Sequence, residues 1–123
     1  IWQPRDGMDM QQVWFAGAHA DIGGGYPPDK DGSLLSDNAL GWMVDEVSKS
    51  GLTVEGHLQQ RINGNPLATL HRSRRSFYRV KEKYYRPIDH GKGAVMIHSS
   101  VKERWQRNSG YRPQNLKGFA GDF

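Results

Sequence analysis

A short apolar run from Val13 to Ala18 most constrains how this chain can fold. The run is rich in β-prone residues and is ended by polar residues and glycine, a pattern typical of a strand buried on both faces of a mostly parallel sheet. Such a strand needs neighbouring strands beside it and helices packed on the sheet. The sequence therefore predicts an α/β fold, with a mostly parallel sheet and flanking helices.

The clearest helix is predicted over residues 36–50. Ser36 is suited to its N-cap, and Gly51 is suited to its end. The helix carries one apolar stripe with i, i+3, i+4, i+7 spacing, made of Leu40, Met43, Val44 and Val47. Because this stripe needs a sheet to cover, the chain alone is expected to be unstable, oligomeric or strand-swapped.

Three further elements are predicted from turn residues and capping patterns. A short helix is expected near residues 55–62, and a short strand over residues 94–97. The spacing of Ser100 and Glu103 is typical of a capping box and predicts another short helix there. The tail from residue 109 to residue 123 shows no clear period, so it is expected to be an extended loop.

The candidate site is the glycine-rich loop over residues 19–33, directly after the first strand. His19 and Asp21 come first, and three glycines follow at Gly23–Gly25. Ligand sites in open α/β sheets lie at the carboxyl ends of the strands, where a histidine would be well supported as a general base. Consecutive glycines allow unusual backbone angles and close approach. The alternative is a structural role, with a hydrogen-bonded histidine in a tight turn.

Charge is unevenly distributed within the net +4 of the chain. Residues 1–50 are acidic, residues 51–123 are basic, and residues 71–86 alternate basic with aromatic side chains. Such a surface can engage phosphates, bases or an anionic membrane surface. Because no recognised nucleic-acid module surrounds it, nucleic acid is disfavoured as a partner. A solvated charged face is the simpler interpretation.

Two longer motifs resemble a known family. The sequences VWFAGAHADIGGGYP and LSDNALGWMVDEV are similar to the signature of an uncharacterised α/β-hydrolase domain family, which includes phospholipase effectors of type VI secretion systems. Later segments agree with the same family in the same order: Leu70–Ser73, Phe77–Arg79, Arg86–Ile88, Ile97–Val101 with Arg104, and Tyr111–Leu116.

The resemblance implies a Ser–Asp–His triad that hydrolyses an ester, with phospholipids as candidate substrates. His19 would be the triad histidine, which takes the serine proton and later gives it to the leaving group. The nucleophile pattern G-x-S-x-G is absent from the sequence. In the chain order that the resemblance implies, the serine precedes the acid and the histidine, so the nucleophile is expected upstream of Ile1, and the triad acid as well. Asp21 is a second candidate for orienting His19, or else it holds the glycine loop through backbone amides.

On this interpretation, residues 1–123 are the C-terminal part of an α/β-hydrolase domain and are inactive alone. Their expected partner is the upstream part of the same domain or a second copy. The alternative function is a non-catalytic basic module that binds anionic lipid or nucleic acid. His98 beside Ser99 and Ser100 could form a second His/Ser pair, but helix capping explains this pattern better.

No cofactor or metal is expected. His57, His71 and His90 have no partners at metal-ligand spacing. The absence of cysteine excludes disulfides, thiolate metal sites and a cysteine nucleophile. No segment reads as a signal peptide, and the cellular compartment stays open.

Overall fold

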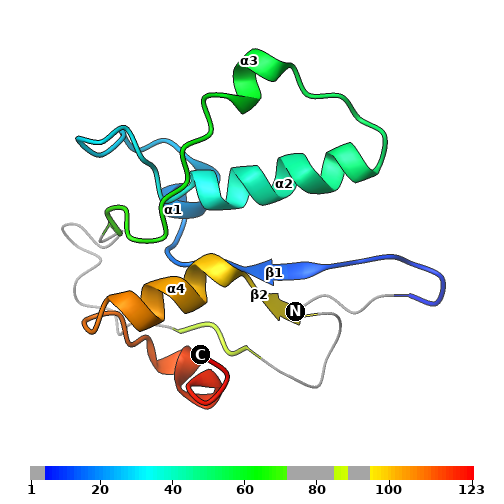
Figure 1. The fold of residues 1–123 in the computed structure, drawn as a ribbon. Coiled ribbons are helices and arrows are strands. Elements are labelled where there is room, and N and C mark those ends of the chain that lie inside the picture. The colour runs from blue at the N-terminus through cyan, green and yellow to red at the C-terminus, as the bar shows by residue number, and fades with distance from the viewer. Residues whose placement is uncertain (1–4, 72–84, 89–94) are drawn as a thin grey trace, which may run out of the picture. The chain divides into compact units, whose positions relative to one another are not determined.

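The computed structural model describes residues 5–71, 85–88 and 95–123 (Figure 1). The chain forms two compact units, which are described separately. Unit 1 contains residues 1–14 and 74–123, and unit 2 contains residues 15–73. Unit 2 is therefore inserted in sequence between the two halves of unit 1.

Unit 1 is built on a parallel pair of strands. Strand β1 (Gln12–Trp14) pairs with β2 (Val95–Ile97), with Gln12 opposite Val95 and Trp14 opposite Ile97. The predicted strand over 94–97 is confirmed. The first strand is also present, but its bounds differ from those of the apolar run Val13–Ala18. Strand β1 begins at Gln12 and ends at Trp14, and the backbone then turns at Gly17, whose φ is +107°.

The parallel pair with its helices agrees with the predicted α/β class. The strand residues of β1 are only half-buried, so full burial on both faces was wrong for the described sheet, which has two strands. The finer assignment to an α/β-hydrolase fold stays a prediction.

Helix α4 (Ser99–Arg107) follows β2 directly and confirms the predicted helix, but its cap differs. His98 is the N-cap residue, and its imidazole accepts a hydrogen bond from the Ser100 amide. The Ser100–Glu103 capping box was therefore wrong. The reason is that His98 still has the extended backbone of the strand, so the helix begins one residue before Ser100.

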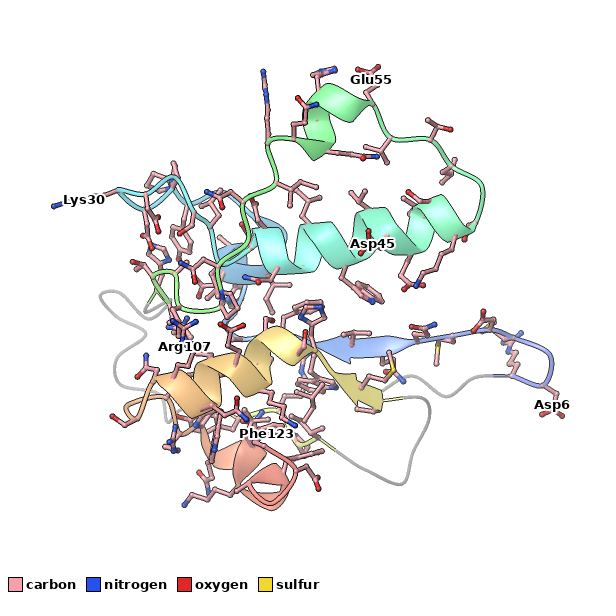
Figure 2. All side chains as sticks on the ribbon, in the orientation of Figure 1. Asp6, Lys30, Asp45, Glu55, Arg107 and Phe123 are labelled. Atoms are coloured by element: carbon pink, nitrogen blue, oxygen red, sulfur yellow. The ribbon has the colours of Figure 1, made fainter. Side chains whose placement is uncertain are left out.

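The C-terminal tail is not the extended loop that was expected. Residues Gln114–Phe119 form a 3₁₀ helix, η2, whose Leu116 is buried. The ring of Trp105 packs edge-on against Phe123, with centroids 5.6 Å apart, and Figure 2 labels Phe123 near this helix. Apolar burial thus orders a tail that shows no period in its sequence.

The described part of unit 2, residues 15–71, contains the helices α1 (Ala20–Gly23), α2 (Asp37–Lys49) and α3 (Gly56–Gln59). The helices predicted over 36–50 and near 55–62 are confirmed. Gly51 ends the first of them with a φ of +86°, as expected of a C-terminal glycine. Ser36 is the N-cap residue of α2, although its side chain makes no capping hydrogen bond. The loop expected over 19–33 is interrupted by α1.

The apolar stripe of α2 is only partly covered. Val44 and Val47 are half-buried. Trp42, which is not part of the stripe, packs against Phe15, with ring centroids 5.9 Å apart. Leu40 and Met43 are 48% and 50% exposed. Within the described ranges, none of the helices has the length and apolar character that crossing a bilayer requires.

A returning segment, residues 63–71, completes unit 2. Its residue Gly64 forms a parallel bridge with Leu34, and the Asn63 amide donates to the Asp37 carboxylate at 2.8 Å. Further along, the Thr69 amide donates to the Asp29 carboxylate at 2.8 Å. These bonds hold the segment beside the start of α2 and beside the loop at Asp29. The amide of His71 then donates to Asp21 of α1, where the candidate site lies.

Candidate active site

A tight turn over residues 17–21 connects the apolar run to α1. Gly17 has a φ of +107°, and a Cβ added there would lie 2.4 Å from the Cβ of Asp21. No side chain fits in that space without a shift of the backbone. The turn therefore requires glycine at this position.

His19 has an unusual backbone conformation in this turn. Its φ is +46° and its ψ is −112°, and among the described residues it is the one non-glycine residue with a positive φ. Its carbonyl oxygen accepts hydrogen bonds from the amides of Ile22 and Gly23, at 3.1 and 2.8 Å. Such a conformation costs about 1–3 kcal/mol and persists only where surrounding contacts enforce it. The side chain of His19 is exposed.

Asp21 is the buried member of the turn, with 2% of the residue exposed. Its Oδ1 accepts hydrogen bonds from the backbone amide of His71 at 3.1 Å and from the Nδ1 of the same residue at 2.9 Å. Its Oδ2 lies 3.4 Å from the Ala18 amide. These donors compensate the burial of a carboxylate, which is costly when it has no partner.

His71 is held by two kinds of contact. Besides the bonds to Asp21, its ring stacks on Tyr26, with centroids 3.7 Å apart and an interplanar angle of 17°. Because the carboxylate of Asp21 is an acceptor, Nδ1 of His71 carries a hydrogen and Nε2 is the other ring nitrogen. The imidazole is thus fixed in position and in tautomer.

The comparisons with known proteins bear on this same stretch. Residues 3–46 match the family model for the catalytic domain of Tle1-like phospholipase effectors of type VI secretion systems (T6SS). The predicted family resemblance is confirmed. Neither the search of curated proteins nor that of solved structures gives a match.

The match to the Tle1-like family includes β1, the His19 turn, α1 and most of α2. It supports a phospholipase-type effector at the level of the domain family. The motifs quoted for residues 70–116 lie outside the match, so their agreement with the family stays a prediction.

Two roles were left open for Asp21: to orient His19, or to hold the glycine loop through backbone amides. The Asp21 carboxylate accepts hydrogen bonds from the backbone amides of Ala18 and His71, in keeping with the second role, and also bonds to the His71 ring. Sequence reasoning included His71 in the Leu70–Ser73 segment but missed its contact with Asp21, because fifty residues separate the two. No local pattern signals a contact over that separation.

His98 acts as a cap in unit 1. Its Nδ1 lies 2.8 Å from Ser100 Oγ and 3.2 Å from the Ser100 amide, so both groups of one serine bond to one ring nitrogen. Partial burial lowers the pKa of His98 below its ordinary value of 6.5. The contacts give this His/Ser pair a capping role, but the cap is His98 and not Ser100 as predicted.

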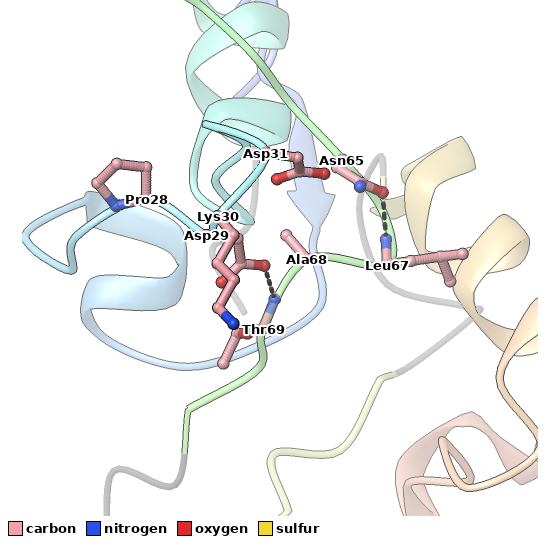
Figure 3. A pocket seen from close by; sticks show the side chains of 8 residues that line it. All are labelled: Pro28, Asp29, Lys30, Asp31, Asn65, Leu67, Ala68 and Thr69. Atoms are coloured by element: carbon pink, nitrogen blue, oxygen red, sulfur yellow. Dashed lines mark hydrogen bonds between the residues drawn. The ribbon is translucent and has the colours of Figure 1, made fainter.

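A shallow pocket of unit 2 is lined by residues outside the turn over residues 17–21. Figure 3 shows it between the loop at Pro28–Asp31 and the returning segment at Asn65–Thr69. Its carboxylate and amide groups are engaged locally, since Asp29 accepts from the Thr69 amide and Asn65 accepts from the Leu67 amide. Over the part of the chain that the structure describes, no group of three or more acidic, histidine or cysteine side chains is arranged to hold a metal ion.

The basic and aromatic segment predicted over residues 71–86 lies mostly outside the described residues, which omit 72–84. The alternative function as a binding module for anionic lipid or nucleic acid therefore stays a prediction.

Proposed function

We propose that this chain supplies the triad histidine, His19, to a serine-type hydrolase that cleaves acyl ester bonds of phospholipids. One observation carries the proposal: within the segment that matches the phospholipase effector family, an exposed histidine has a strained backbone at a turn between a strand and a helix. Strain of this kind is concentrated at active sites, where it fixes the orientation of a reacting group.

The chemistry requires a serine from outside these residues. The imidazole of His19 accepts the hydroxyl proton of that serine while its Oγ attacks the acyl carbonyl. The imidazolium then donates the proton to the leaving lysophospholipid oxygen, and an acyl-enzyme remains. A water molecule, deprotonated by the same imidazole, releases the fatty acid and restores the serine.

The proposal extends to the domain that surrounds this chain. Leu40 and Met43 of α2 are about half exposed, although they belong to the stripe that a sheet was expected to cover. We assign this uncovered part of the stripe to contact with the remainder of the hydrolase domain, which would also bring the nucleophile and the triad acid.

The test uses the protein that carries this chain together with its nucleophile, assayed on phosphatidylglycerol–phosphatidylethanolamine vesicles. His19→Ala is expected to lower fatty-acid release by about three orders of magnitude or more, as loss of a triad member does. The matched control is His57→Ala, because His57 is an exposed histidine on α3, and its activity should equal that of the unmodified protein.

Two results would overturn the proposal. Wild-type turnover in His19→Ala would remove His19 from the mechanism. Release of the phosphorylated headgroup in place of fatty acid would remove the acyl ester as the bond that is cleaved.

A further inference from the structure

The carboxylate of Asp21 accepts hydrogen bonds from two parts of unit 2 that are far apart in the sequence. Two of its three hydrogen-bond donors, the amide and the Nδ1 of His71, come from the returning segment. The third is the amide of Ala18, from the turn itself. The side chain of Asp21 is only 1% exposed, so water does not replace these donors when one is lost.

These bonds close a short loop around His19. Ala18 and Asp21 flank His19 and Ala20, and they are joined twice, by the Ala18 amide to the Asp21 carboxylate and by the Asp21 amide to the Ala18 carbonyl at 2.9 Å. A strained backbone keeps its geometry only where such contacts over-determine it. The Asp21 carboxylate is therefore one of the contacts that hold the backbone on either side of His19.

His71 in turn sets the position of that carboxylate. Its ring is stacked on Tyr26, and the chain two residues before it is tied to Asp29 through the Thr69 amide. A group that is itself fixed by packing and hydrogen bonds can hold a reactive neighbour to within a fraction of an ångström.

We propose that His71 is a positioning residue for His19, acting through the carboxylate of Asp21. In this arrangement Asp21 is a structural link between two histidines and not the triad acid. The inference rests on the proposed function, because it assumes that His19 is the histidine that transfers protons.

The test compares three variants of the protein that carries the nucleophile, with turnover expressed per folded molecule. His71→Ala removes the side-chain donor and is expected to lower kcat by about 10- to 100-fold with little change in KM, as small displacements of a catalytic group do. His71→Asn keeps an N–H donor near the position of Nδ1 and should recover most of the lost kcat.

The third variant, Asp37→Ala, separates positioning from stability. It breaks the bond to the Asn63 amide and so weakens the same unit away from the turn. Its kcat per folded molecule should stay unchanged at a comparable loss of stability. If His71→Ala does not fold, Tyr26→Leu replaces it, since this variant removes the ring stack and leaves the donors; a tenfold fall in kcat is then expected.

Several outcomes would overturn the inference. Full kcat in His71→Ala would show that the contacts of His71 with Asp21 and Tyr26 have no effect on the reaction. The same holds for full kcat in Tyr26→Leu where that variant replaces His71→Ala. An equal fall in Asp37→Ala would assign the effect to stability. A loss in His71→Asn as large as in His71→Ala would show that the imidazole itself is required. Each of these leaves the proposed function intact if His19→Ala is inactive, whereas an active His19→Ala rejects the proposed function itself.

Discussion

The Nδ1 atom of His71 lies 2.9 Å from Oδ1 of Asp21, and the same oxygen accepts the backbone amide of His71 at 3.1 Å. One carboxylate oxygen therefore binds both the side chain and the main chain of one residue. This arrangement fixes the ring of His71 and leaves a single nitrogen, Nε2, for any other contact. It also has consequences that can be measured on the chain by itself.

His71 and His98 should have opposite tautomers. His71 donates through Nδ1 to a carboxylate, whereas His98 accepts at Nδ1 from the Ser100 amide. Long-range ¹H–¹⁵N correlation spectra at pH 8 should show a hydrogen on Nδ1 of His71 and on Nε2 of His98. Asp21→Ala should remove the preference of His71 and leave His98 unchanged. A hydrogen on Nε2 of His71 in place of Nδ1, in the unmodified chain, would contradict the hydrogen bond from Nδ1 to Asp21.

Gly17 should tolerate no side chain. In Gly17→Ala the new Cβ would lie 2.4 Å from the Cβ of Asp21, at a φ of +107° that disfavours alanine. The free energy of unfolding is expected to fall by at least about 2 kcal/mol, from the sum of backbone strain and overpacking. Gly23→Ala is the control in the adjacent helix, because a Cβ there meets nothing within 4 Å. Urea unfolding measures both, and equal stabilities of the two variants would refute the account of the turn.

Stability should decrease in mild acid through His98. Burial lowers the folded-state pKa of His98 below its ordinary 6.5, so folding favours the neutral ring that caps α4. This contribution is complete above pH 6.5 and is lost as the pH falls through the folded-state pKa. His98→Asn preserves a capping acceptor without titrating, so it should lose less stability than the unmodified chain between pH 7.5 and pH 5.5.

The control for this pH effect is His57→Asn, which changes an exposed histidine. Its pH dependence should match that of the unmodified chain. Identical acid sensitivity in His98→Asn and the unmodified chain would show that the cap does not titrate in this range.

Asp37 should stabilise unit 2 through its bond to the Asn63 amide as well as through its position at the start of a helix. Its buried carboxylate accepts the Asn63 amide at 2.8 Å and lies in the first turn of α2, where the helix dipole favours negative charge. Asp37→Ala leaves that amide without its acceptor and should cost about 1–3 kcal/mol. Asp45→Ala changes an exposed carboxylate of the same helix and should stay within about 0.5 kcal/mol. Denaturant midpoints of the two variants would decide between these expectations.

The chain alone should self-associate through the uncovered part of the α2 stripe. Sedimentation velocity at increasing concentration should show oligomers, and Leu40→Gln with Met43→Gln should reduce them, because both side chains are about half exposed. Leu52→Gln, at an exposed leucine outside the stripe, is the control. A monomer at every concentration would remove the stripe as a contact surface.

Features with a local cause could be predicted from the sequence. The helix over residues 36–50 follows from its spacing and from Gly51, and α3 and β2 follow from turn residues. Helix α4 was located correctly, although the capping box used to predict it was wrong. The His19 turn was located for the same reason, because glycines and a histidine directly follow an apolar run.

The features that were missed depend on distant contacts or on competition between neighbours. The bond between Asp21 and His71 joins two segments that only the folded loop brings together. The cap of α4 was assigned to Ser100 because serine is the commoner cap, while the extended backbone of His98 places the imidazole there instead. The 3₁₀ helix of the tail depends on burial of Leu116, which a sequence window cannot show.

The insertion of unit 2 between β1 and β2 sets an order for assembly during synthesis. Strand β1 leaves the ribosome before residues 15–73, and its partner β2 follows only after they have been made. Both Asp21 and His71 lie within that interval, so their bond can form before β1 pairs with β2. The nascent chain would then contain the bond between His71 and Asp21, next to His19, before β1 has paired with β2.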